Sequence, residues 1–304
     1  MDTRRIGSLD VSVVGLGCNN FGWRIDEPAS AAVVNAALDA GVTLFDTADM
    51  YGRGKSEEFL GRALGARRRE VTIATKFGHR SGWPDRGAHP DYIPRALEAS
   101  LRRLGTDWVD LYQLHTPDPN VPIADTLGAL DALVASGKVR EVGCSNFSTT
   151  QLAEADAVRT PHLVRFASVQ NHFNMLARAD QDVVTACAQT GRAFLPYYPL
   201  ESGLLSGKYR LGKPAPEGTR ITNGGRYAPL LSDENLAMVE RLATYAESRG
   251  RTLLELAFAW LLSHPPVASV IAGATSVSQE KANAEAARWR LASLEREEVD
   301  ALLA

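Results

Sequence analysis

The feature that most constrains the fold of this chain is a strand–helix alternation that repeats eight times. Each unit pairs a short apolar segment, typical of a buried strand, with a segment whose apolar residues recur at helical spacing. Strands that alternate with helices in this way are parallel, because the helix returns the chain across the sheet. Eight units of roughly 30 residues favour a closed (β/α)8 TIM barrel. The expected strands span residues 13–18, 42–48, 71–76, 108–115, 139–146, 166–173, 193–200 and 267–274.

Amphipathic helical segments fill the intervals between these strands. The apolar stripe around Val33 and Ala37, for example, is followed by Gly41, a residue type that commonly ends helices. An open doubly wound sheet is disfavoured, because GLGCNNFG after the first strand lacks the GxGxxG spacing of that fold. The expected helices span residues 29–40, 56–64, 93–104, 123–134, 149–159, 180–190, 232–248, 252–263 and 276–286.

Three additions to the barrel are expected within a single domain, residues 1–304. RRIG and LDVSVV predict an N-terminal β-hairpin, and LEREEVDALLA predicts a C-terminal helix on the outside of the barrel. The segment 201–231 after strand 7 is rich in Gly, Pro and basic residues, which is typical of a lid or binding loop. It is not a Walker A loop, because Gly203–Lys208 is one residue short and Tyr209 replaces Ser or Thr.

Charge and cysteine content disfavour several classes of partner. A net charge of −3 argues against general binding to nucleic acid or to a membrane surface. The N-terminus has no apolar stretch suited to a signal peptide or membrane span. The three scattered cysteines form no CxxC motif, so neither a disulfide framework nor a metal site is expected. We therefore expect a cytoplasmic protein and leave its oligomeric state open.

Polar side chains stand where three successive strands end, the end at which barrels of this kind place their chemistry. Asp46, Lys76 and His115 end strands two to four, and Tyr51 follows in a glycine-bracketed loop. Each has a structural alternative when taken singly. Asp46 could cap the next helix, Lys76 could face solvent, His115 could be a satisfied core histidine, and Tyr51 could pack beneath its loop. Four titratable groups converging on one mouth favour a shared site.

These four residue types form a chemically coherent set. A lysine beside a phenol favours the phenolate, so we expect Lys76 to lower the pKa of Tyr51 below its ordinary value near 10. A carboxylate at Asp46 would keep that lysine charged and in position. A neutral His115 would hydrogen-bond a carbonyl group. The set predicts a tyrosine that donates a proton to a developing alkoxide, as carbonyl reduction requires.

Seven segments, in order and at matching spacing over essentially the whole chain, resemble the aldo-keto reductase family. The resemblance is greatest to the bacterial branch that is similar to potassium-channel β-subunits. It implies a (β/α)8 barrel in which Tyr51 is the general acid/base, Lys76 and Asp46 tune its pKa, and His115 orients the carbonyl. The segments are GVTLFDTADMYGRGKSEEFLGRAL, VTIATKFG, LGTDWVDLYQLH, GKVREVGCSNF, SVQNHFN, PYYPLESGLLSGKY and VIAGATSVSQEKANAEA.

The resemblance also implies a nicotinamide dinucleotide cofactor, with NADP(H) preferred and NAD(H) possible. Gln279 stands where many relatives have an arginine that pairs with the 2′-phosphate, while the basic loop 201–231 supplies positive charge. A helix N-terminus after the eighth strand is a natural phosphate site. The implied cofactor-binding residues are Ser145, Asn146, Gln170, Tyr197, Leu200, Ser202, Gly203, Lys208, Gly273, Ala274, Thr275, Gln279 and Asn283.

Substrate identity is less constrained than reaction type, because specificity in barrels lies in the βα-loops. Phe21, Trp23 and Trp83 are candidate pocket walls for a small carbonyl or alcohol substrate, with loop packing as the alternative for each. Three other functions stay open. One is a cofactor-sensing regulatory subunit with little turnover, and another is a sugar dehydrogenase working in the oxidative direction. The third is an aldolase-like Schiff base on Lys76, which would not require Gln170, Tyr197 or the GLLSGK loop.

Overall fold

The computed structural model describes residues 1–79, 87–158 and 163–304. Its centre is a parallel eight-stranded sheet whose strands follow one another in the order β10-β3-β4-β5-β6-β7-β8-β9. A parallel bridge between Phe194 and Val267 joins β9 to the segment before β10 and closes the barrel. The (β/α)8 expectation is confirmed. The strands are β3 (Val14–Gly17), β4 (Leu44–Asp46), β5 (Thr72–Phe77), β6 (Val109–Leu114), β7 (Val139–Ser145), β8 (Ser168–His172), β9 (Ala193–Tyr197) and β10 (Val270–Gly273).

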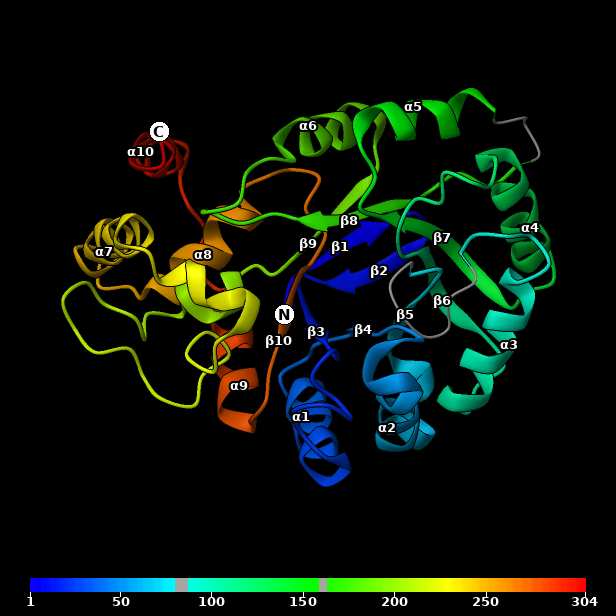
Figure 1. The fold of residues 1–304 in the computed structure, drawn as a ribbon, viewed down its shortest axis with the longest axis horizontal. Coiled ribbons are helices and arrows are strands. Elements are labelled where there is room, and N and C mark those ends of the chain that lie inside the picture. The colour runs from blue at the N-terminus through cyan, green and yellow to red at the C-terminus, as the bar shows by residue number, and fades with distance from the viewer. Residues whose placement is uncertain (80–86, 159–162) are drawn as a thin grey trace.

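Helices surround the strands, as Figure 1 shows. Their ends follow the local signals in the sequence: Asp26 caps α1 by accepting from the Ala29 N–H, and α3 ends at Gly105 in the left-handed region. The helices are α1 (Glu27–Asp39), α2 (Lys55–Leu64), α3 (Ile93–Leu104), α4 (Ile123–Ala135), α5 (Thr149–Ala157), α6 (Gln181–Thr190), α7 (Asp233–Glu247), α8 (Leu253–Leu262), α9 (Val277–Ala286) and α10 (Ser293–Leu302).

The N-terminal hairpin β1 (Thr3–Ile6) and β2 (Leu9–Ser12) plugs one end of the barrel. Ile6 and Val11 are fully buried in one apolar cluster with Leu44, Leu111 and Leu195 from the barrel strands. A second, larger cluster lies between the strands and the helices. Since apolar residues fill the hairpin end, polar groups are left to gather at the opposite end, where the strands terminate.

Short 3-10 turns and the outer helices α7 and α10 complete the fold. The chain after β9 runs through η3 (Glu201–Ser206), a long irregular segment and η4 (Gly225–Leu231) before α7. The outer helices α7 and α10 lie side by side (Figure 1), where Tyr245 donates to Glu298 at 2.8 Å. Two further turns, η1 (Tyr51–Gly54) and η2 (Gly65–Glu70), flank α2. Of the helices that the structure describes, none combines the length and hydrophobicity needed to span a bilayer.

Candidate active site

Asp46, Lys76 and Tyr51 lie together at the strand ends, as expected. Lys76, the second-last residue of β5, is fully buried, and its Nζ donates to Asp46 Oδ2 at 2.6 Å and to the carbonyl oxygen of Thr47 at 2.8 Å. The same Nζ lies 3.4 Å from the hydroxyl oxygen of Tyr51, the first residue of η1. The ammonium group therefore bridges a carboxylate and a phenol, which excludes a solvent-facing lysine.

Lys76 is held in its charged form. Burial lowers its pKa, but the neighbouring Asp46 carboxylate and the Tyr51 hydroxyl outweigh that effect, so the net pKa of Lys76 is raised. A charged, buried lysine without these partners would be costly. The lysine is thus a fixed positive charge beside the phenol.

The net direction of the Tyr51 pKa differs from the sequence expectation. Burial raises the pKa of Tyr51, and the favourable charge of Lys76 reduces this rise without reversing it. The prediction of a lowered pKa was therefore wrong in sign, because it weighed the lysine but could not weigh desolvation. As a consequence, Tyr51 is protonated throughout the neutral range and is poised to donate a proton.

Two glutamines hold the second oxygen of the Asp46 carboxylate. Gln170 Nε2 donates to Asp46 Oδ1 at 2.9 Å, and Gln113 Nε2 lies 3.5 Å from the same atom. Gln170 therefore has a structural connection to the Lys76 network in addition to the cofactor contact that the resemblance implies. The sequence interpretation missed Gln113, although it lies two residues before His115 on a buried strand.

His115 stands beside Tyr51 and is uncharged. Their rings meet edge to face with centroids 5.9 Å apart. Burial first, then the charges of Lys76 and His79, lower the pKa of His115 well below its ordinary value. Its Nδ1 has no hydrogen-bond partner within the described part of the chain. The ring of His79, a residue that the sequence did not single out, packs edge-on against the His115 ring, with the two centroids 4.7 Å apart.

The ends of β7, β8 and β9 form one hydrogen-bonded row. Ser145 Oγ donates to the carbonyl oxygen of Gln170 at 2.6 Å, and Asn146 Nδ2 donates to that of His115 at 2.9 Å. The Tyr197 hydroxyl donates to Asn146 Oδ1 at 2.8 Å. Asn146 has a positive φ of 63°, a conformation that asparagine tolerates better than most residues. The row keeps polar groups beside the His115 and Tyr51 pair.

The turn after β9 is strained and tightly held. Glu201 and Ser202 adopt positive φ values of 43° and 58°. The Glu201 carboxylate is buried and bonds His172 at 2.8 Å and Asn174. Strain of this kind persists only where surrounding contacts hold it, and it clusters at ligand-binding sites. Leu200, Ser202 and Gly203 therefore lie in a preset loop at the mouth.

A group of cations lies next to this turn. A side chain added at Gly203 would meet Lys208 Nζ at 3.0 Å, so Lys208 lies directly against the turn. Burial and the charges of Arg24 and Arg220 lower the pKa of Lys208. Arg220 donates to Asn20 Oδ1 at 2.7 Å, which joins the long loop to the β3 end. Lys208, Arg24 and Arg220 bring three positive charges to one place, which suits an anionic ligand.

The β10 end supplies the remaining predicted cofactor positions. Gln279 Oε1 accepts from the N–H of Thr275 at 2.9 Å and from its hydroxyl at 3.0 Å, so Gln279 stabilises the turn into α9. Asn20 Nδ2 reaches the carbonyl oxygen of Ala274 at 3.3 Å, and Asn283 is buried on α9. Asn20 hydrogen-bonds both Ala274 and Arg220, so it connects this segment, which begins at Gly273, to the long loop that carries Arg220. The sequence interpretation did not single out Asn20 or Arg24.

The candidate substrate residues differ in their exposure to solvent. Phe21 is fully buried in the hydrophobic core, which leaves its side chain no surface for substrate contact. Trp23 is 63% exposed and lies beside the Arg24 guanidinium. Trp83 lies outside the described residues. Of the two candidates in the described part of the chain, Trp23 presents a surface that a ligand could reach and Phe21 does not.

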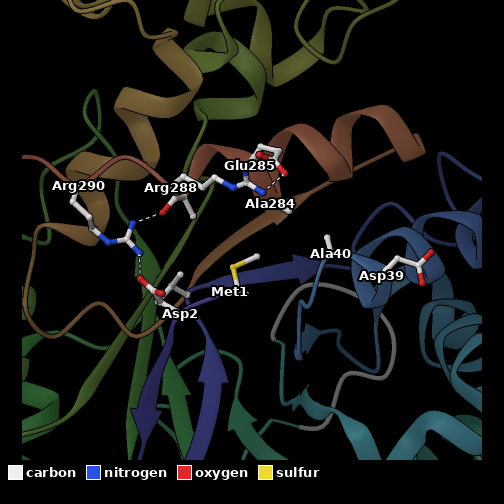
Figure 2. A pocket seen from close by; sticks show the side chains of 10 residues that line it. Met1, Asp2, Asp39, Ala40, Ala284, Glu285, Arg288 and Arg290 are labelled. Carbon is white, nitrogen blue, oxygen red and sulfur yellow. Dashed lines mark hydrogen bonds and ion pairs between the residues drawn. The ribbon is translucent and has the colours of Figure 1, made fainter.

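A cavity of about 470 Å³ lies away from the strand ends (Figure 2). It is lined by the chain start, the end of α1 and the end of α9, and it borders Val13 before β3. Two ion pairs lie in its lining, Arg290 with Asp2 at 2.6 Å and Arg288 with Glu285 at 2.8 Å. None of Asp46, Tyr51, Lys76 and His115 lines this cavity. Within the described ranges no group of three or more His, Cys, Asp or Glu side chains suits a metal ion.

Comparison with known proteins gives a consistent result. The profile of the aldo/keto reductase family matches residues 13–304. An aldo-keto reductase [NADP(+)] from Schizosaccharomyces pombe is 35% identical, over 86% of this chain and 79% of its own length. A probable voltage-gated potassium channel subunit beta from Arabidopsis thaliana is 35% identical, over 91% and 88%. The solved glycerol dehydrogenase from Gluconobacter oxydans is 31% identical with a TM-score of 0.85, over 99% of this chain and 95% of its own.

Proposed function

The chain belongs to the aldo/keto reductase family, and we propose that it is an NADP(H)-dependent oxidoreductase that interconverts an aldehyde or ketone with its alcohol, using Tyr51 as general acid/base. One observation carries the proposal. Lys76 Nζ lies between Asp46 Oδ2 at 2.6 Å and the Tyr51 hydroxyl at 3.4 Å. A partly buried phenol in contact with a charged lysine can give up its proton and hold the resulting negative charge.

Each residue of the group has a distinct part in this reaction. A reduced nicotinamide, when bound, supplies the hydride. Tyr51 donates its proton to the carbonyl oxygen, and Lys76 stabilises the phenolate that remains. Neutral His115, edge-on to Tyr51, hydrogen-bonds the carbonyl oxygen and orients it. In the oxidative direction the phenolate, which Lys76 stabilises, accepts the proton of the alcohol.

The residues at the strand ends fit a nicotinamide dinucleotide phosphate. The hydroxyl and amide groups of Ser145, Asn146 and Gln170 suit the nicotinamide carboxamide, and the Tyr197 ring suits stacking. Lys208, whose pKa is lowered by burial and by the charges of Arg24 and Arg220, suits the phosphates together with Arg220. The name of the fission-yeast relative, which specifies NADP(+), also supports this choice. Use of NAD(H) is the alternative, because Gln279 adds no charge.

Turnover assays decide among the candidate functions. Purified protein is incubated with NADPH or NADH and a panel of aldehydes, ketones and aldoses, and the nicotinamide absorbance is followed. The panel includes glyceraldehyde and dihydroxyacetone, the carbonyl counterparts of glycerol, because of the Gluconobacter dehydrogenase. We expect steady NADPH oxidation with at least one small carbonyl.

Three other results would each favour a different function. NADPH binding without turnover on the whole panel would favour a cofactor-sensing subunit and contradict the proposed activity. Turnover of aldoses or polyols only with NAD(P)⁺, in the oxidative direction, would favour the sugar dehydrogenase instead. Borohydride trapping of substrate on Lys76 would point to a Schiff base.

A further inference from the structure

Asp49 is a buried carboxyl that the proposed reaction does not use. It lies two residues before Tyr51, between β4 and η1, and is 1% exposed. Neither of its oxygens has a hydrogen-bond partner in residues 1–79, 87–158 or 163–304. Buried polar groups are nearly always paired, so an unpaired carboxyl this close to the proton donor requires an explanation.

Glu57, the acid whose charge raises the pKa of Asp49, is already paired with Arg103. Glu57, on α2, is fully buried, and its carboxylate accepts from Thr75 Oγ1 at 2.6 Å and from Arg103 Nε, on α3, at 2.6 Å. Arg103 thus balances the charge of Glu57. If Asp49 ionises, a second negative charge enters the buried space beside Arg103, which already pairs with Glu57.

The strands on the other side of Asp49 offer it little compensation. Lys76, on β5, is turned toward Asp46 and the carbonyl oxygen of Thr47. Tyr112, on β6, is fully buried, and its hydroxyl has no hydrogen-bond partner in the part of the chain that the structure describes. The protonated form of the Asp49 carboxyl is therefore favoured over the ionised form.

These surroundings place the Asp49 ionisation in the neutral range. Burial first, then the charge of Glu57, raises the pKa of Asp49 to about 7. Arg103, the N–H of Met50 and Lys76 act in the opposite direction. The Met50 N–H lies nearby but does not reach hydrogen-bonding geometry with the carboxylate.

The segment that contains Asp49 also positions Tyr51. The Asp49 N–H donates to the carbonyl oxygen of Lys76 at 3.1 Å, which fixes the start of the segment on β5. At its other end, a side chain added at Gly54 would meet Arg103 Cδ at 2.8 Å, so η1 rests directly on that arginine. A new charge on Asp49 would compete with Glu57 for Arg103 or draw in water, and either change acts on the turn that holds Tyr51.

We propose that Asp49 is a positioning residue for Tyr51: its protonated form keeps the turn Tyr51–Gly54 in place for proton donation, and its ionisation displaces that turn. The inference rests on the proposed role of Tyr51 as proton donor. It predicts that reduction slows as pH rises through the neutral range. Neither Tyr51, whose pKa is raised, nor His115, whose pKa is well below its ordinary value, titrates in that range.

The test compares the pH profiles of wild type, Asp49→Asn and the control Asp10→Asn, whose side chain is 73% exposed on the distant hairpin. Hydride transfer is followed in single turnovers of NADPH with a reducible aldehyde between about pH 6 and about pH 8.5. We expect the rate to fall with pH in wild type and in the control, and the fall to be at least about threefold smaller in Asp49→Asn. Identical profiles in all three proteins would overturn the proposal.

A measurement without turnover separates this inference from the proposed function. Carbon-13 NMR of labelled aspartate in the wild-type protein reports the Asp49 titration directly, with Asp49→Asn as the assignment control. Glu57→Gln should move that midpoint to lower pH, because a like charge is removed. If no carbonyl is reduced but Asp49 titrates near neutrality, the proposed function fails and the environment of Asp49 stands. If turnover occurs and Asp49 titrates at its ordinary value, the Asp49 inference fails alone.

Discussion

Lys76 Nζ lies 3.4 Å from the Tyr51 hydroxyl, although the two residues are 25 positions apart on different βα-units. The contact exists because β4 and β5 are adjacent parallel strands that end at the same edge of the barrel. It places a fixed positive charge where a phenolate would form.

Tyr51→Phe should reduce kcat for carbonyl reduction by at least about 100-fold, because the proton donor is lost while its ring remains. NADPH affinity, measured by fluorescence quenching, should change little. Tyr245→Phe, which removes a hydroxyl that bonds Glu298 on the outer helices, is the matched control and should retain activity. A Tyr51→Phe enzyme with most of its activity would show that another group donates the proton.

Lys76→Met should lower both activity and stability. Without the ammonium, no positive charge offsets the cost of forming the Tyr51 phenolate away from water. The buried Asp46 carboxylate also loses its ion-pair partner. Removing one partner of a buried ion pair costs about 3–5 kcal/mol. Denaturant unfolding and kcat/KM measure the two effects. The surface substitution Lys138→Met should change neither appreciably, and equal behaviour of the two variants would contradict the assigned role.

Arg220→Ala should weaken NADPH binding by roughly 10-fold and NADH binding by less, since a charge-assisted contact to phosphate is lost. The difference should shrink as salt concentration rises. Lys213→Ala removes an exposed cation from the same loop and serves as the control. Equal weakening of both cofactors would mean that Arg220 acts only through its bond to Asn20.

Gln279→Arg should tighten NADPH more than NADH, because it adds a positive charge at the start of α9. Dissociation constants for both cofactors, measured by fluorescence titration, test this. The substitution also removes the Thr275 contacts of Gln279. Gln279→Ala therefore separates the loss of those contacts from the gain of charge. Equal effects of Arg on both cofactors would place this residue away from the 2′-phosphate.

Glu280→Gln should stabilise the protein increasingly as pH rises. Glu280 is fully buried, and burial raises its pKa to about 8, with Asn283 opposing. The folded carboxyl thus keeps its proton while the unfolded carboxyl ionises. Wild-type stability is therefore lost between the unfolded pKa of about 4.5 and the folded value of about 8, and then levels off.

Thermal unfolding of both proteins from about pH 5 to about pH 9 measures this difference, which should reach on the order of 2–5 kcal/mol. Glu285→Gln, on the exposed side of α9, is the control and should show no such trend. A constant difference between Glu280→Gln and wild type across this range would mean that Glu280 is not the titrating group.

The sequence alone determined the barrel and the strand ends that carry Asp46, Lys76 and His115. Hydrophobic periodicity and strand–helix alternation are local properties, and parallel strands must end together, so Asp46, Lys76 and His115 were bound to meet. The long loop after strand 7 and the outer helices also followed from local composition.

Only the tertiary structure decided the balance of burial against charge. The raised pKa of Tyr51, the burial of Phe21, and the contacts of Asp46 with Gln113 and Gln170 depend on what lies around each group from distant parts of the chain. Desolvation and like-charge repulsion, as at Asp49, are set by three-dimensional surroundings that residue spacing does not encode.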